Sequence, residues 1–171
     1  NGGTFQYTLS MLEAARALRD WDVTLYTTAP LEPVYRRLSL TTRLIPAKRA
    51  GDAPLLARAR LGLRARVPFP DVDLVLSPIK SALLLHTSRP FLFTLHDLQE
   101  RYLPEFSSRA RRVYLDAMYS SLLRRAAGVI CESTHVATDI TTFYGYDPER
   151  IHVIPAPPLR LAAQFDDSTL R

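Results

Sequence analysis

Two spacings of apolar side chains alternate along the chain, and they predict alternating helices and strands. Over residues 4–20, apolar side chains recur every three or four positions, which is typical of one face of a helix. Residues 22–28 follow with a run of β-branched and aromatic side chains that predicts a strand. The same criteria predict a long helix over residues 107–126 and a shorter one over Thr134–Tyr144, which Gly145 ends.

Further short apolar runs lie between these helices and predict the remaining strands. They occupy residues 42–45, 72–76, 91–95, 128–132 and 151–154. Short apolar strands separated by helices are typical of a parallel sheet that is covered by helices on both faces. The sequence therefore predicts a doubly wound α/β domain with a mainly parallel sheet. The arginines of residues 43–66 point to different sides of a helix, so we interpret that stretch as a solvated helix.

Candidate functional residues are expected directly after each strand, because doubly wound sheets bind ligands beyond the carboxyl ends of their strands. His96 and Asp97 follow the run 91–95. A histidine at this edge can donate to a sugar hydroxyl or a phosphate oxygen, or move a proton near neutral pH. The competing interpretation is that Asp97 caps the next segment while the ring of His96 only packs.

A second set of polar residues follows the run that ends at Cys131. It comprises Glu132, Ser133 and Thr134. Ser133 or Thr134 suits the N-cap of the helix that begins there, and a capping hydroxyl at this edge can also meet a ligand. Lys80 follows another strand, but most lone lysines are simply solvated.

A pair of glycines, Gly2 and Gly3, precedes the first predicted helix. Glycines let the backbone approach a phosphate closely, and a helix N-terminus offers free N–H donors and the positive end of the helix dipole. The pair is therefore a candidate seat for an anion. An ordinary tight turn is the alternative, because two glycines are far less specific than a full GxGxxG.

The composition and the short motifs exclude several classes of site and partner. The 171 residues are 47% hydrophobic and 23% charged, as in a globular domain, with a formal net charge of +5. The single cysteine, Cys131, excludes a disulfide framework, and no HExxH-type spacing indicates a metal site. No basic run is interleaved with aromatic residues, so nucleic acid is not an expected partner. Without an apolar run of roughly 18–20 residues or a signal peptide, we expect a cytoplasmic domain.

Five stretches, in this order along the chain, resemble the N-terminal domain of retaining GT-B glycosyltransferases, namely glycosyltransferase family 4 or group 1. They are Gly-Gly-x-x-x-Tyr in residues 2–7, Phe-Thr-Leu-His-Asp-Leu in 93–98, Leu-Pro-Glu-Phe-Ser in 103–107, Arg-Ala-Ala-Gly-Val-Ile-Cys-Glu-Ser in 125–133 and Tyr-Gly-Tyr-Asp-Pro-Glu-Arg-Ile-His-Val-Ile-Pro in 144–155. The likeness spans essentially the whole chain, and residues 43–67 are its least distinctive part.

The resemblance implies a Rossmann-like domain that forms one half of a GT-B fold, together with roles for individual residues. Gly2 and Gly3 would lie against the diphosphate of a nucleotide-sugar donor, and the catalytic position would be His96, beside the transferred sugar. The acceptor side of the cleft would be lined by Tyr7, Asp97, Glu132, Ser133 and Thr134. The family needs no cofactor and no essential metal, and it transfers the sugar to a hydroxyl acceptor with retention of configuration.

The resemblance also suggests how the chain is organised. Residues 1–158 would form the acceptor-side domain, without its first strand, and residues 159–171 would begin an interdomain linker. The family's C-terminal, nucleotide-binding domain, with its Glu-x7-Glu signature, is not in the sequence. We therefore predict that residues 1–171 alone do not transfer sugar. The acceptor, the donor sugar and peripheral contact with the inner face of the membrane stay open.

Two other functions remain as alternatives. The first is a non-catalytic Rossmann-like module that binds a nucleotide or a partner protein. The second is a nicotinamide-dependent dehydrogenase. The dehydrogenase is disfavoured because GxGxxG is absent and because no acidic residue ends the strand predicted over residues 22–28.

Overall fold

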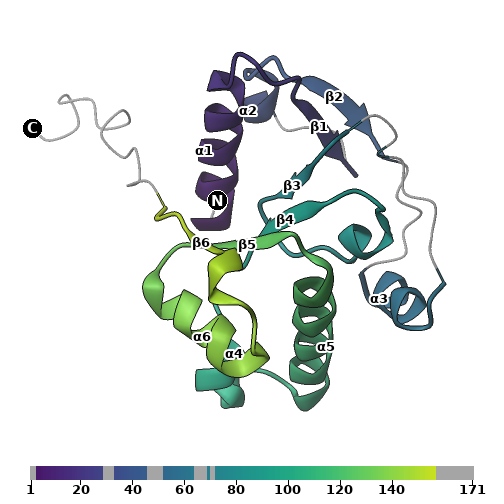
Figure 1. Cartoon of the computed structure of the whole chain (residues 1–171), viewed down its shortest axis with the longest axis vertical. Coiled ribbons are helices and arrows are strands. Elements are labelled where there is room, and N and C mark those ends of the chain that lie inside the picture. The colour runs from purple at the N-terminus through teal and green to yellow at the C-terminus, as the bar shows by residue number, and fades with distance from the viewer. Residues whose placement is uncertain (1–2, 29–32, 46–51, 64–68, 70–71, 157–171) are drawn as a thin grey trace, which may run out of the picture.

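The computed structural model describes residues 3–28, 33–45, 52–63, 69 and 72–156 (Figure 1). The elements follow one another as α1 (Gly3–Ala17), β1 (Thr24–Thr27), α2 (Pro33–Arg36), β2 (Thr41–Leu44), α3 (Asp52–Arg60), β3 (Val75–Ser77), η1 (Ala82–His86), β4 (Phe91–Thr94), α4 (Gln99–Tyr102), η2 (Pro104–Phe106), α5 (Arg109–Arg125), β5 (Gly128–Cys131), α6 (Thr134–Tyr144), η3 (Pro148–Arg150) and β6 (Ile151–Val153). The η elements are short 3-10 helices. Helices and strands thus alternate as the hydrophobic pattern predicts.

All the strand pairs in the described part of the chain are parallel. Strands β3, β4, β5 and β6 form one sheet in that order, and β1 pairs with β2 in a separate two-stranded sheet. The prediction of an α/β fold with a mainly parallel sheet is therefore confirmed. The division into two hydrogen-bonded sheets was not predicted. Strand β2 is exposed along its whole length, whereas β5 is buried throughout.

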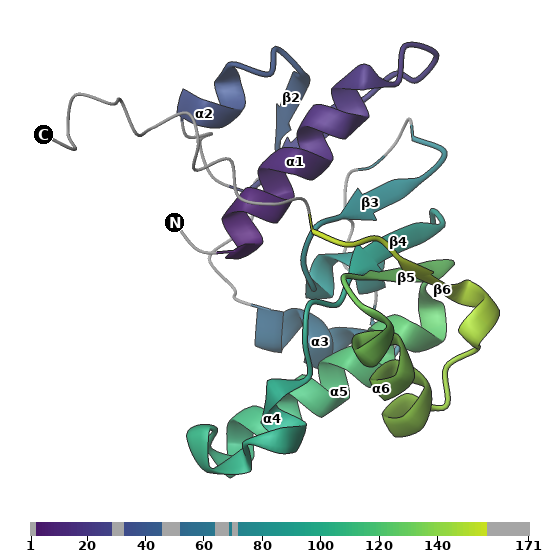
Figure 2. The ribbon, with the colours of Figure 1, turned by 90° about the vertical axis from the view of Figure 1, so that its left-hand side faces the viewer.

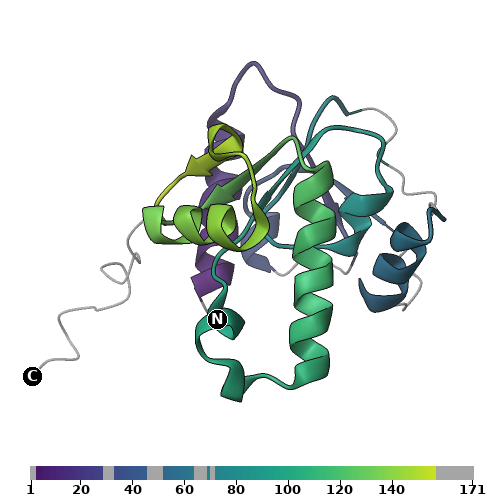
Figure 3. The ribbon, with the colours of Figure 1, turned by 60° about the horizontal axis from the view of Figure 1, so that its bottom comes forward.

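Helices cover both faces of the four-stranded sheet, as predicted. Figure 2 shows α1 on one side of its strands and α5 and α6 on the other. Figure 3 gives the same arrangement from below, with α5 and α6 in front of the sheet. Because both faces are covered, the central strands must be apolar on both sides, which explains their short unbroken apolar runs.

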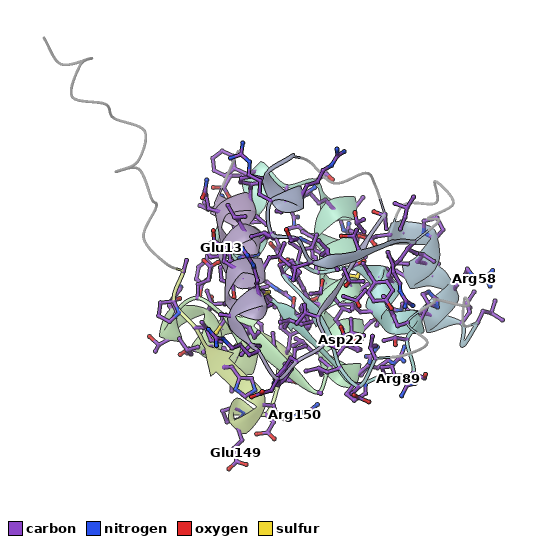
Figure 4. The ribbon with its side chains drawn as sticks, turned by 90° about the horizontal axis from the view of Figure 1, so that it is seen from above. Glu13, Asp22, Arg58, Arg89, Glu149 and Arg150 are labelled. Carbon is purple, nitrogen blue, oxygen red and sulfur yellow. The ribbon has the colours of Figure 1, made fainter. Side chains whose placement is uncertain are left out.

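The core lies between β4, β5 and the inner face of α5. Phe91, Phe93, Met118, Leu122 and Val129 are all almost completely buried there. Some ionic side chains lie at the surface, and Figure 4 shows Arg58 and Glu149 pointing away from the body of the molecule. The core is thus built from the central strands and one long helix.

Cys131 also belongs to this core, at the end of β5. Burial raises the pKa of its thiol, which keeps the sulfur protonated and unreactive. A cysteine inside a short apolar run is typical of a small buried hydrophobe rather than a nucleophile, and the structure agrees.

Most predicted boundaries agree with the structure within a few residues. Helix α6 has the predicted limits because its two caps are encoded locally: Ser133 Oγ accepts a hydrogen bond from the amide of Val136, and Gly145 adopts the left-handed conformation at φ 61°. The strand predicted over residues 72–76 is present, but its start was wrong, since β3 begins only at Val75. The polar residues 98–105 predict a loop, and α4 and η2 form there instead.

Several sequence predictions lie partly or wholly outside the described residues. In the arginine-rich stretch, α3 (Asp52–Arg60) forms the predicted helix and buries Leu56, whereas residues 46–51 and 64–68 are not described. The linker predicted over residues 159–171 also falls outside.

Gly128 leaves no room for a side chain where β5 meets β4 and β6. A Cβ built on it would lie 2.8 Å from Leu92 Cδ2 and 3.1 Å from the carbonyl oxygen of Arg150. The leucine tip can move but the backbone oxygen cannot easily do so. We therefore expect Gly128→Ala to lower the free energy of unfolding by about 1–3 kcal/mol. Urea denaturation of the two chains checks this, and an unchanged midpoint would contradict the close packing described here.

Candidate functional site

Loops that follow three neighbouring strands meet at the carboxyl edge of the four-stranded sheet. Pro78 follows β3, His96 follows β4 and Glu132 follows β5. Nδ1 of His96 lies 2.7 Å from Oε1 of Glu132, and its Nε2 lies 2.9 Å from the carbonyl oxygen of Pro78. The strand order thus brings together residues that are far apart in the sequence.

Both ring nitrogens of His96 have acceptors as partners. A carbonyl oxygen can only accept, so Nε2 carries a proton and donates it to Pro78. Nδ1 lies within hydrogen-bonding distance of the carboxylate of Glu132. The side chains of His96 and Glu132 are 22% and 29% exposed, so the pair is held in place but stays within reach of a ligand. The site therefore presents a fixed imidazole rather than a freely rotating one.

Tyr7 of α1 packs against this imidazole. The two rings meet edge to face, with their centroids 5.1 Å apart and their planes at 89°. Tyr7 is buried, and its phenol oxygen accepts a hydrogen bond of 3.5 Å from the hydroxyl of Thr94. Burial raises the pKa of this phenol, so the hydroxyl stays neutral. Tyr7 therefore forms one wall of the site and links α1 to the end of β4.

The contact through Tyr7 also places the start of α1 close to His96. Gly3 begins α1 and lies one helical turn before Tyr7, and Gly2 lies outside the described residues. Gly3 is exposed, and a Cβ built on it would meet no atom within 4 Å. The first amides of a helix have no hydrogen-bond partner within it, so the N-terminus of α1 offers N–H donors.

The other predicted site residues lie around the same edge. Asp97 is exposed and its Oδ1 accepts a hydrogen bond of 3.4 Å from the amide of Gln99, which supports the turn into α4. The half-buried Ser133 caps α6, so the structural role considered for it is present. Thr134 is exposed in the first turn of that helix. Any contact of these three residues with a ligand remains a prediction.

A groove opens on the far side of Asp97, between the segment 97–107 and the first half of α5. It encloses about 260 Å³. Charged, aromatic and apolar side chains line it, among them Lys80, Asp97, Glu100, Phe106, Arg111 and Tyr119. We call it the α4–α5 groove. Asp97 directly follows His96 in the sequence, so the groove borders the loop that carries the imidazole.

Contacts to α5 and α6 hold α4 in place beside this groove. The guanidinium of Arg101 contacts Asp116 and lies over the rings of Phe143 and Tyr144, at 5.3 and 5.4 Å from their centroids. The neighbouring Tyr102 donates its hydroxyl proton to the buried Asp139. Helix α4 is short, so these contacts rather than its own hydrogen bonds fix its position.

Comparison with known protein families identifies the family of this chain. A model of the family described as Glycosyltransferase Family 4 matches residues 1–157, which include every loop described above. The chain belongs to glycosyltransferase family 4. It is a glycosyltransferase N-terminal module, and its fold is consistent with one half of a GT-B enzyme. The chain matches no curated protein.

The glycosyltransferase module thus brings together His96, Glu132 and Tyr7, three of the residues singled out in the sequence. The pairing of Glu132 with His96 was not predicted, although the order of the strands is a signal that could have suggested it. The carbonyl of Pro78 and the side chain of Glu100 were also missed. Lys80 was expected to be solvated, but it lines the α4–α5 groove with Nζ 5.7 Å from the centroid of the Tyr119 ring.

Among the described residues of this glycosyltransferase module, no group of three or more His, Cys, Asp or Glu side chains could hold a metal ion. In the same part of the chain, every helix is too short or too polar to cross a bilayer.

Proposed function

We propose that this glycosyltransferase module is the acceptor-side half of a GT-B enzyme of the hexosyltransferase type. The enzyme transfers a hexosyl group from a nucleotide sugar to a hydroxyl acceptor, with retention of configuration and without a cofactor or an essential metal. The proposal includes a cytoplasmic location and a C-terminal domain that binds the nucleotide. The observation that supports it best is the position of His96, which is held by Glu132 and Pro78 and packs against Tyr7, one helical turn after the start of α1.

The start of α1 suits the negative charge that develops on the leaving group during transfer. As the bond to the sugar breaks, negative charge builds up on the leaving diphosphate. The amides of Gly3 and the rest of the first turn of α1, with the positive end of the helix dipole, stabilise such a charge. In the proposal, Gly2 also contributes to this anion-binding site.

His96 acts on the sugar itself in this proposal. Its ring donates hydrogen bonds, because both of its nitrogens face acceptors in the chain. A sugar hydroxyl or a donor phosphate oxygen can compete with the carbonyl of Pro78 for the proton on Nε2. Fixing the ring between Tyr7, Glu132 and Pro78 keeps it in place before the substrates bind, which lowers the ordering cost of catalysis.

The acceptor approaches along the other side of the cleft. In the proposal Asp97, Glu132, Ser133 and Thr134 border its path, and the exposed Asp97 and Thr134 are free to meet its hydroxyls. Retention requires the acceptor hydroxyl to attack from the face of the sugar that the diphosphate leaves. The contact of His96 with Tyr7 of α1 supports the proposal that both events occur at one end of the cleft.

The test is an assay of the natural full-length protein with a set of UDP- and GDP-hexoses. We expect release of the nucleoside diphosphate from one donor, with water or an added glycoside as acceptor, and the same rate in the presence of EDTA. The 171-residue chain alone should release none. Proton NMR of the product reports the anomeric configuration.

Three results of that assay would contradict the proposal. Binding of a nucleotide without any turnover by the full-length protein would favour a non-catalytic module. Turnover by residues 1–171 alone would contradict the half-domain, and an inverted product would contradict retention.

A further inference from the structure

Glu100 carries a buried carboxylate, and one of its oxygens is unpaired among the described residues. Its side chain lies in the wall of the α4–α5 groove, and the residue is only 9% exposed. Its Oε1 has no hydrogen-bond partner in the described part of the chain. Buried polar atoms of native proteins are almost always paired, and an unpaired one is costly. A donor from outside the chain would remove this cost.

The charged side chains around Glu100 indicate which chemical class of ligand supplies this hydrogen-bond donor. Lys80 and Arg111 line the same groove as Asp97 and Glu100, so two cations stand beside two carboxylates. Burial raises the pKa of the Tyr119 phenol, and the negative charges of Glu100 and Asp97 raise it further. Both carboxylates therefore lie close to its ring. An anionic ligand would be repelled by the acids and a cationic one by the bases. A neutral molecule with many hydroxyls can donate to the carboxylates and accept from Lys80 and Arg111.

Size and apolar surface agree with a single sugar ring. The groove holds about 260 Å³, close to the lower limit of roughly 300 Å³ for ligand pockets. Phe106, at the rim, is 76% exposed and offers a flat apolar surface to the C–H face of a sugar. A metal ion is a poor alternative, because the described residues hold no cluster of three suitable ligands.

We infer that the α4–α5 groove binds the acceptor of the glycosyltransferase as a neutral, polyhydroxylated ring. Glu100 accepts a hydrogen bond from one hydroxyl of this ring, and Lys80 donates to another. Asp97 lines the groove and directly follows His96 in the sequence, so a ring seated there lies beside the loop that carries the imidazole. The inference rests on the proposed function and adds to it the chemical class of the acceptor.

The test compares acceptors and variants in the natural full-length protein, with the donor that the hydrolysis assay selects. The acceptors are free hexoses, their methyl glycosides, their octyl glycosides and the corresponding hexose 6-phosphates. We expect the neutral hexoses or glycosides to be used and the phosphates to be used poorly. A preference for octyl over methyl glycosides would place the ring at the end of a lipid-linked acceptor, and equal use would favour a free saccharide.

Glu100→Gln should lower transfer, relative to hydrolysis of the same donor, by about tenfold or more through a higher acceptor KM. Glu105→Gln is the matched control, because Glu105 is exposed in the neighbouring turn η2, and its ratio should not change. Glu100→Gln keeps the shape of the side chain and removes an unpaired charge, so its thermal midpoint should stay the same or rise. Lys80→Met, which needs no buried substitution, should raise the acceptor KM as well.

The outcomes separate the two proposals. If the full-length protein releases no nucleoside diphosphate from any donor, the proposed function fails and the groove loses its role with it. If transfer occurs but neither Glu100→Gln nor Lys80→Met changes the acceptor KM, only the groove is refuted. A lower thermal midpoint of Glu100→Gln with an unchanged transfer ratio would assign Glu100 to structure alone. Better use of hexose phosphates than of neutral hexoses would overturn the neutral acceptor.

Discussion

Replacing His96 with alanine should lower kcat for sugar transfer by about a hundred- to a thousandfold. In the proposed mechanism the imidazole donates a hydrogen bond to the sugar or to the leaving phosphate, and one such donor aimed at developing charge has this magnitude. The loss should appear in kcat more than in the KM of the donor, because the nucleotide is held elsewhere. Initial rates of nucleoside diphosphate release by the full-length protein, over a range of donor concentrations, measure both.

The matched control for this change is His152→Ala. His152 is exposed on β6, the edge strand, and has no part in the site. Its variant should keep the parental rate. Because the side chain of His96 is only partly buried, far-ultraviolet circular dichroism of His96→Ala should stay unchanged. A parental rate in a folded His96→Ala protein would remove His96 from the mechanism.

The position of His96 was predictable because it depends on local signals. A short apolar strand ends at Thr94, polar residues follow, and the residues after a parallel strand face the ligand-binding edge. The same rule located Glu132 and Ser133 after β5. Local signals also fixed α6, whose N-cap hydroxyl and C-terminal glycine lie next to it in the sequence.

What sequence reasoning missed depends on contacts between distant residues. The bond between His96 and Glu132 exists because β4 and β5 are neighbours in the sheet, which no local pattern states. Helix α4 is too short to form alone and is held by the contacts of Arg101 and Tyr102 with α5 and α6. The burial of Glu100 follows from that placement. The polar segment 98–105, predicted as a loop that lines the cleft, thus carries a short helix and a buried carboxylate beside a groove.

Replacing Phe93 with alanine should lower the free energy of unfolding by about 3–5 kcal/mol, a large part of the 5–15 kcal/mol of a typical domain. Phe93 is fully buried in β4, between β3 and β5, and its removal leaves a cavity that neighbouring strands cannot close. The shift of the urea midpoint at constant slope measures the loss. Phe106→Ala, at 76% exposure, removes the same ring from the surface and should change stability by less than about 0.5 kcal/mol. Equal losses in the two variants would mean that β4 does not lie at the centre of the core.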